Sequence, residues 1–432
     1  MKNVSIINQH AMNLKITSIL LVLFVLLTAS SCDNATQIED LKKDDLPDPI
    51  NITLNTIENS LIKSDQAFAF ELFSKVFAEE QKDENQNFMI SPFSLSMALA
   101  MTWNGSDNET KLAIQETLKM SGKSDDEVNN YFKKLKESFE KTDPSTKLAI
   151  ANSIWTNENI KILPEFLSLN QKFFNATVEA VDFSNPATAQ RINQWADDKT
   201  NGLIKEVIEE TSPRALMYLL NALYFKGIWT SEFDAKNTSK MKFIPEQGNT
   251  QSVDMMQQNA HFNYASDETM QLIELPYGNQ AFSMMVLLPQ QGRIIADISR
   301  TLQNKDYWRN IKSKLRDSNV DLFLPKFKTE YSKQLNSVLK DMGMDIAFSP
   351  NDADFSRMSD TPSFISFVKQ FTYIATDEVG TEAAAVTVVG METTSFPSTP
   401  EKVTFKADRP FIYVIQENST GSILFMGVVN RF

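Results

Sequence analysis

The chain has 432 residues, 42% hydrophobic and 22% charged, so it can bury a large core. Its formal net charge of −13 argues against nucleic-acid binding and against a polybasic membrane-binding patch. The sequence also contains no Gly-rich phosphate loop and no nucleic-acid-binding motif. We therefore expect neither nucleic acid nor a phosphate-bearing cofactor as a partner.

The first 31 residues have the features of a targeting segment. Lys15 precedes an apolar run over 16–27, which is too short to span a bilayer comfortably and fits the core of a signal peptide. The stretch Met12-Asn-Leu-Lys15 is itself a compact signal start, so Met12 is a second candidate initiator. We expect residues 1–31 to be a signal peptide.

The end of this segment, Leu27-Thr-Ala-Ser-Ser-Cys32, resembles the lipobox of bacterial lipoproteins. The resemblance implies a lipid on Cys32 and a place in the bacterial cell envelope, facing either the periplasm or the outside. Ala29 stands where Leu is usual, so an ordinary signal peptide followed by an incidental Cys is the alternative. Because Cys32 is the single Cys, no internal disulfide can form.

Residues 32–59 are polar and acidic, and we expect a flexible tether there, followed by one large domain over 60–432. Apolar residues recur at helical spacing over Asp65–Phe77 and Ser94–Trp103, with Ser91-Pro92 suited to start the second helix. Strand-like runs lie mainly in the second half, at Phe282–Leu288, Val320–Leu324, Phe411–Ile415 and Ile423–Val429. This order predicts an α+β fold with antiparallel or mixed sheets.

Few residues are suited to catalysis. His261 is the only His after the targeting segment, and its alternating surroundings, Asn259–Tyr264, predict a strand. The sequence has no Gly-x-Ser-x-Gly elbow and no His-Glu-x-x-His, and one His with one lipidated Cys disfavours a zinc site. We interpret His261 as a half-exposed strand residue, and expect neither an enzyme nor a cofactor.

The stretch Thr376–Phe396 combines strand-forming residues with loop punctuation. Its small and β-branched residues suit a half-buried strand, whereas Gly380, Gly390 and the Ser, Thr and Pro that follow indicate a loop. If the stretch forms a strand, alternate residues lie on the same face, and the acids Glu382 and Glu392 both fall on one face. The opposite face carries Thr381, Ala383, Ala385, Thr387, Val389 and Met391. One face could therefore be buried without burying a charge, and no Pro would interrupt a ladder.

Several ordered segments resemble the serpin family from about residue 60 to the end. They are Asn87–Ala100 (NFMISPFSLSMALA), Asn221–Trp229 (NALYFKGIW), Leu324-Pro-Lys-Phe327, Ala407-Asp-Arg-Pro-Phe411 and Leu424-Phe-Met-Gly427. The resemblance implies a fold of about nine helices around three β-sheets. It also implies an exposed reactive-centre loop over about 378–400.

In inhibitory serpins this loop is bait. A serine protease attacks it and forms an acyl-enzyme, and the cut loop then inserts as a new strand into a central sheet and distorts the protease. The resemblance assigns the loop hinge to Glu378, Gly380, Thr381, Glu382, Ala383, Ala384 and Ala385. The alternative is a serpin-scaffold binding lipoprotein whose loop never inserts.

Other positions match by motif. Trp229, Lys326 and Glu378 match the region where the loop first inserts, and we expect a Lys326–Glu378 ion pair there. A polar cluster beneath the opening strands is matched by Ser91, Ser94 and Asn221, with Gln370 in place of the usual His. A Gln amide can donate and accept, so we expect the cluster to survive.

The position of the reactive bond follows from counting residues. Taking Glu378 as the seventeenth residue before the bond gives Thr394–Ser395, with Met391 and Phe396 as alternatives. We expect a monomer that binds elastase-, chymotrypsin- or subtilisin-like proteases, with papain-like cysteine proteases as a further candidate class. The lipid anchor would be its only membrane contact.

Trypsin-like proteases should be poor targets. Residues 381–400 contain no Lys or Arg, and a trypsin-like specificity pocket needs a cation to pair with its acid. Incubating the chain with trypsin should leave most of the protease activity intact. Rapid stoichiometric loss of trypsin activity would contradict this assignment.

Overall fold

A computed structural model of the chain describes residues 46–82, 86–200, 202–213, 215, 217–304, 306–381 and 402–432, except for the side chains of 221–223. Residues 47–432 form one compact unit. Several predicted positions lie outside the described residues, namely the targeting segment, Cys32, hinge residues 382–385, Met391, Thr394, Ser395 and Phe396.

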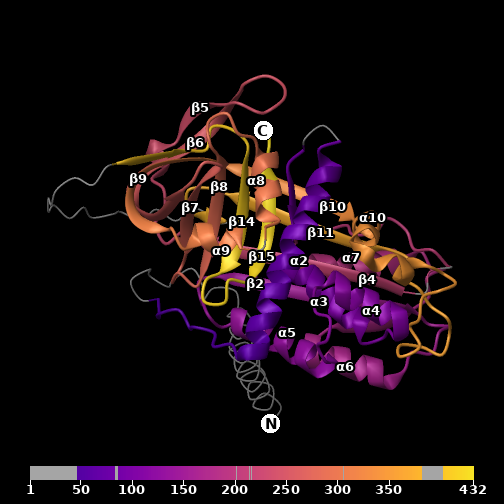
Figure 1. The fold of residues 1–432 in the computed structure, drawn as a ribbon. Helices are drawn as coiled ribbons and strands as arrows, with labels where there is room; N and C mark the ends of the chain where they lie inside the picture. The colour runs from indigo at the N-terminus through magenta and orange to yellow at the C-terminus, as the bar shows by residue number, and fades with distance from the viewer. Residues whose placement is uncertain are drawn as a thin grey trace, which may run out of the picture. The chain divides into compact units, whose positions relative to one another are not determined.

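Nine α-helices occur in the described part of the chain. They are α2 (Thr56–Glu80), α3 (Pro92–Trp103), α4 (Asn108–Thr117), α5 (Asp125–Phe139), α6 (Pro164–Phe174), α7 (Ala187–Lys199), α8 (Ile295–Leu302), α9 (Tyr307–Lys312) and α10 (Asn336–Leu339). None of the helices in these ranges is long and apolar enough to cross a membrane. Figure 1 shows α2 beside α3, and α2 also packs against α5 and α8.

The first sheet has six strands in the order β10-β11-β12-β4-β2-β3. These strands are β2 (Lys147–Asn157), β3 (Thr177–Val181), β4 (Met217–Ile228), β10 (Phe327–Gln334), β11 (Val368–Thr376) and β12 (Gly380–Thr381). The only contribution of the expected loop to this sheet, within the described residues, is the two-residue strand β12.

The second sheet has nine strands in the order β1-β15-β14-β8-β7-β6-β9-β13, with β5 paired to β6. Its members are β1 (Phe88–Ile90), β5 (Ser239–Phe243), β6 (Gln251–Ser266), β7 (Met270–Tyr277), β8 (Phe282–Pro289), β9 (Arg316–Pro325), β13 (Val403–Lys406), β14 (Phe411–Glu417) and β15 (Ile423–Val429). The 16-residue strand β6 pairs with β5, β7 and β9 along its length. Two of the three expected sheets are therefore joined through β6 into one hydrogen-bonded network.

The predicted helices and strands are confirmed, and the helices extend further than the apolar spacing indicated. The helix predicted over Asp65–Phe77 is the 25-residue α2, which starts at a capping box between Asn55 and Glu58. All twelve residues of α3 are buried, so the helix is packed on every side. Its first turn uses Ser91 as N-cap and Pro92 at the first helical position, as predicted.

The folded unit begins earlier than expected. Residues 47–59, predicted to belong to the tether, pack on the domain, and α2 already begins at Thr56. Side chains from distant segments bind the backbone here, because Asn279 donates to Pro47 O, Thr142 donates to Ile50 O and Ser419 accepts from Ile52 N. A polar composition thus did not prevent order, since the backbone groups found partners elsewhere.

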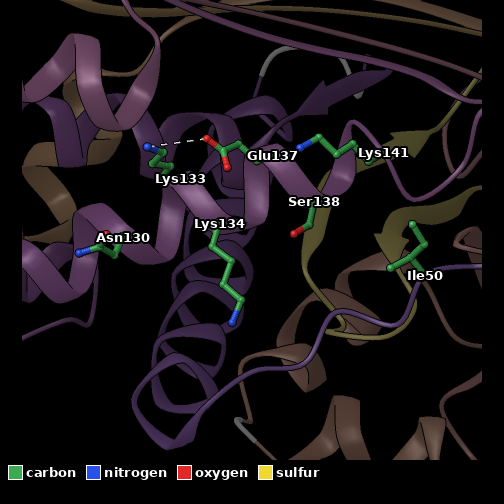
Figure 2. Close-up of a pocket in the computed structure, with 7 residues that line it drawn as sticks. All are labelled: Ile50, Asn130, Lys133, Lys134, Glu137, Ser138 and Lys141. Atoms are coloured by element: carbon green, nitrogen blue, oxygen red, sulfur yellow. Dashed lines mark ion pairs between the residues drawn. The ribbon is translucent and has the colours of Figure 1, made fainter.

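A hollow lies between this segment and α5, lined by Ile50 and polar residues of the helix (Figure 2). Two of its lysines already have acidic partners. Lys134 Nζ lies 2.6 Å from Glu58 Oε2, and Lys133 Nζ lies 3.8 Å from Glu137 Oε1. Lys141 also lines the hollow, but no further observation points to a ligand, and we assign none to it.

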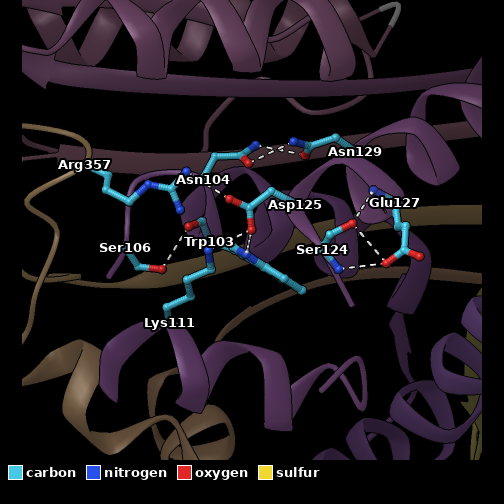
Figure 3. Close-up of polar contacts among 9 residues, drawn as sticks. All are labelled: Trp103, Asn104, Ser106, Lys111, Ser124, Asp125, Glu127, Asn129 and Arg357. Atoms are coloured by element: carbon cyan, nitrogen blue, oxygen red, sulfur yellow. Dashed lines mark hydrogen bonds and ion pairs between the residues drawn. The ribbon is translucent and has the colours of Figure 1, made fainter. Parts of the chain in front are cut away.

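Asp125 connects four segments of the helical layer (Figure 3). It accepts a 2.8 Å hydrogen bond from Trp103 Nε1 and forms ion pairs of 2.8 Å with Lys111 and 2.9 Å with Arg357. Partial burial acts to raise the pKa of this carboxyl, but these three donors outweigh it and hold the pKa below the usual Asp range. Asp125 therefore stabilises the fold at neutral pH, and that contribution is lost as the pH falls through its lowered pKa.

We expect Asp125→Ala to lower the free energy of unfolding by about 2 kcal/mol at pH 7, since three donors lose their shared acceptor. Urea denaturation followed by far-UV circular dichroism measures the change. The neighbouring Asp126 is exposed, so Asp126→Ala is the matched control and should change the midpoint little. Equal effects of the two substitutions would show that the contacts of Asp125 do not matter.

Candidate functional site

The candidate site is the end of the six-stranded sheet where β12 lies between β11 and β4. Thr381 pairs with Thr376 of β11 on one side and with Gly227 of β4 on the other. Further along, β11 and β4 pair directly with each other in parallel, over 368–371 and 219–222. The two strands are thus neighbours at one end of the pair and are separated by a third strand at the other.

This arrangement is a wedge-shaped opening in the sheet. Neighbouring strands lie about 4.8 Å apart, so β11 and β4 are about 10 Å apart where β12 separates them. The opening narrows towards the direct pair Phe371–Ala222. Its geometry fits an extended peptide that adds backbone hydrogen bonds on both sides.

Gly380 is required at the wide end by a close approach of two backbones. A Cβ on Gly380 would lie 2.1 Å from Gly227 O and 2.7 Å from Ile228 Cα. Backbone freedom was the expected reason for this Gly, but its φ is not in the left-handed region. Space, rather than conformational freedom, therefore explains the Gly in this state of the protein.

A tight turn returns the chain from β11 into β12. Asp377 Oδ1 accepts hydrogen bonds from Val379 N and Gly380 N, and Asp377 N donates to Gly380 O. Trp229, which directly follows β4, fastens this turn. Its backbone N donates to Val379 O at 2.8 Å, and its indole Nε1 donates to Asp377 O at 2.9 Å. An Asp at the turn start thus supplies the acceptor that the reversal needs.

Thr381 is fully buried, and its hydroxyl hydrogen bonds that of Tyr277 at 2.6 Å. The Tyr277 ring stacks on Trp229, with centroids 4.5 Å apart and planes 12° apart. Burial raises the pKa of the Tyr277 hydroxyl above its usual range, so the group stays protonated. Thr381 is thus held by the hydroxyl of Tyr277, whose ring is supported by Trp229.

The expected Lys326–Glu378 ion pair is present, with Lys326 Nζ 2.6 Å from Glu378 Oε2. The other carboxylate oxygen accepts from Thr238 Oγ1 at 2.7 Å, and Glu378 O accepts from Phe233 N. Partial burial acts to raise the pKa of Glu378, but Lys326 and Thr238 outweigh it and hold the pKa below the usual Glu value. Since Lys326 lies between β9 and β10, the pair ties the turn to the junction of the two sheets.

The polar cluster lies at the closed end of the wedge. Gln370 Oε1 accepts from Ser91 N at 2.8 Å, and Gln370 Nε2 donates to Ser91 O at 2.9 Å. Ser91 Oγ donates to Leu424 O and accepts from Ser94 N. All of these groups are buried, so Gln370 uses both halves of its amide to hold α3 against β11, as predicted.

Asn221 takes part through its backbone, which pairs with Gln370 on one side and Asn152 on the other. Its side chain is outside the described part.

Thr372 was missed by the sequence analysis, although its hydroxyl donates to Met89 O at 2.7 Å. The sequence did contain a signal for it. Successive side chains of a strand alternate between its two faces, so Thr372 lies on the same face as Gln370 and could have been included in the cluster.

His261 lies on β6, as predicted, with an exposed side chain. Its Nδ1 is 3.0 Å from Asp317 Oδ2 on the neighbouring strand β9. No group of three or more His, Cys, Asp or Glu suited to a metal occurs in the described ranges. At the candidate site itself, the backbone of Thr381 is paired with β11 on one side and with β4 on the other.

Comparison with known proteins agrees with this geometry. The family model described as Serpin (serine protease inhibitor) matches residues 63–431, so the chain belongs to the serpin family. Members of this family are generally protease inhibitors rather than enzymes.

Relatives match over most of their lengths. The chain is 34% identical to Serpin B3 of Homo sapiens and 34% identical to Leukocyte elastase inhibitor A of Rattus norvegicus, in each case over 85% of this chain and 98% of the relative. The crystal structure of Tengpin, a thermophilic serpin in its native state, is similar with a TM-score of 0.80 and 30% identity. That match covers 92% of this chain and 99% of Tengpin.

The Lys326–Glu378 pair can be tested by exchanging its charges. We expect Lys326→Glu and Glu378→Lys each to lower the free energy of unfolding by about 1 kcal/mol, because each places two like charges together. The double exchange should recover most of that loss in thermal denaturation. Lys240–Asp254 is a matched control, since both side chains are about half exposed or more, and its exchange should change little. Strictly additive losses at Lys326 and Glu378 would argue against a coupled pair.

Proposed function

We propose that the chain inhibits proteases as a suicide substrate. The protease would cleave the loop at the assigned bond Thr394–Ser395 and form an acyl-enzyme, and the part of the loop that follows Thr381 would continue the strand that β12 begins. The observation that supports this proposal best is the position of Gly380 and Thr381, already paired between β11 and β4. The opening narrows ahead of Thr381, so a longer strand would have to separate the direct β11–β4 pairs.

The observed register supports a specific path for the inserting strand. Counting on from the pairs Thr381–Thr376 and Thr381–Gly227 brings Thr387 opposite both Gln370 and Asn221. Gln370 and Asn221 now pair with each other, so the two counts are consistent. Insertion would thus bring the Thr387 hydroxyl to the polar cluster, where a buried hydroxyl needs a partner.

The burial of Thr381 supports the parity inferred from the sequence. Residues of the same parity, from Ala383 to Met391, would face the core with Thr381, and Glu382 and Glu392 would face away. About ten new strand residues, each contributing roughly 1 kcal/mol through ladder hydrogen bonds, would make insertion effectively irreversible. The uninserted form would then be metastable.

The target class rests on the loop sequence and on one relative. The bond Thr394–Ser395 remains our assignment, and its uncharged surroundings favour elastase-, chymotrypsin- or subtilisin-like serine proteases. A relative named as a leukocyte elastase inhibitor is compatible with this class.

We further propose that the chain is a monomer without catalytic activity. A lipid on Cys32 would hold it in the bacterial cell envelope, where it would protect the cell from foreign proteases.

The test is a titration of the purified chain against pancreatic elastase, chymotrypsin and subtilisin. We expect an SDS-stable band of chain plus protease, with stoichiometric loss of protease activity. Mass spectrometry of the released C-terminal peptide would identify the cleaved bond, with Ser395 expected as its first residue. Cleavage by every enzyme without a covalent band would instead indicate a binding scaffold.

Thr381→Arg provides the sharper variant. A cation would be expelled from this fully buried position beside Tyr277 and would have to be buried there for the inserted strand to form, at a large desolvation cost, so the loop should be cut without trapping the protease. We expect the covalent band to fall at least tenfold, while cleavage continues. Thr404→Arg makes the same chemical change at an exposed position of β13 and should leave trapping intact. Unchanged trapping by Thr381→Arg would contradict the insertion path.

A further inference from the structure

The helical layer contains a buried acid that no cation accompanies. Asp65 of α2 is 7% exposed and lies where α2, α3 and α5 meet. Tyr131 of α5 donates a 2.8 Å hydrogen bond to Asp65 Oδ2. Ser96 of α3 is also fully buried, close enough for its hydroxyl to affect the carboxyl.

The hydrogen bonding of this junction is incomplete. Asp65 Oδ1 and Ser96 Oγ are both buried, and neither has a hydrogen-bond partner among the described residues. A carboxylate needs donors on both oxygens to be stable in the protein interior, whereas a neutral carboxyl could itself donate to the Ser96 hydroxyl. The geometry therefore favours the protonated form of Asp65.

The surrounding elements supply no compensating charge. Neither α3, α10 nor β15 contains a charged residue. The lysines of α5 have partners elsewhere, with Lys133 on Glu137, Lys134 on Glu58 and Lys136 on Glu140. On α8, Arg300 pairs with Asp297. The other acids of α2 are paired with lysines: Glu58 with Lys134, Glu71 with Lys119, and Glu79 and Glu80 with Lys333. The two lysines of α2 are Lys63, which is exposed, and Lys75, which is half-buried.

We propose that Asp65 makes the folded chain lose stability as the pH rises, because ionisation leaves an uncompensated carboxylate where α2, α3 and α5 meet. The inference concerns the folded chain alone and does not depend on protease inhibition. It makes the junction a proton-linked element of the fold, which binds a proton in acid and releases it near neutrality.

The direction follows from linkage. Burial raises the pKa of Asp65 from 3.8 to about 7, although the hydrogen bond from Tyr131 and the nearby Ser96 hydroxyl act to lower it. Between these two values the folded chain holds a proton that the unfolded chain has lost. Stability therefore falls as the pH rises from about 4 to about 7, and the contribution of Asp65 then stays constant.

The experiment compares the full chain with Asp65→Asn, which keeps the shape and an acceptor for Tyr131 but cannot ionise. Urea denaturation at pH 5 and pH 8 gives the unfolding equilibrium constant of each. From pH 5 to pH 8, the unfolding equilibrium constant of the parent chain should rise ten- to a hundredfold relative to that of Asp65→Asn. Over about two pH units of this range the folded chain holds a proton that the unfolded chain has lost, and each such unit changes the constant up to tenfold. Asp126→Asn removes an exposed acid from α5 and should keep the pH dependence of the parent chain.

Two results would overturn the proposal. An Asp65→Asn effect of equal size at both pH values would assign to Asp65 only a fixed hydrogen-bonding role. If Asp65→Asn does not fold, Tyr131→Phe gives the answer, because it keeps the acid and removes its donor. That variant should move the pH range of the stability loss upward, and an unmoved range would equally exclude the proposal.

Discussion

The candidate site depends on one constraint, that β11 and β4 are neighbours at one end and a strand apart at the other. Thr381 fills the wide end, and the narrow end is closed by direct pairing over 368–371 and 219–222. Every backbone group of a buried sheet needs a partner, so an opening of this kind favours an added strand. The Asp377 turn, Trp229 and Tyr277 all hold the beginning of that strand in place.

The two ends of the opening are held by interactions of different kinds. At the wide end, the Lys326 side chain is 38% exposed, so solvent screens its ion pair with Glu378. At the narrow end, Ser91, Gln370 and Thr372 are buried, and each would leave costly unpaired groups if its hydrogen bonds broke. If the loop inserts as proposed, the sheet would open more easily from the end where Thr381 already lies, and the Ser91–Gln370 contacts would resist separation of β11 and β4 at the narrow end.

The helical layer shows the same physics in two acids with opposite surroundings. Asp125 receives an indole N–H and two cations, so its charged form is favoured despite partial burial. Asp65 receives one phenol hydroxyl and no cation, so burial dominates and the neutral form is favoured. The first acid fastens the ends of helices at all ordinary pH values, and the second makes their packing depend on protons.

Local patterns in the sequence determined the helices α2 and α3, the strands β8, β14 and β15, and the parity that buries Thr381, because periodicity is a short-range property. The family resemblance added Lys326–Glu378 and the polar cluster around Gln370. Only the tertiary structure decided that the folded unit begins at Pro47, that β6 joins two sheets, and that Gly380 is needed for close approach. The first and third features depend on contacts between residues more than a hundred positions apart, Asn279 with Pro47 and Gly380 with Gly227, and no local pattern encodes such contacts. The second depends on which strands pair with β6, which the pattern of a single strand does not specify.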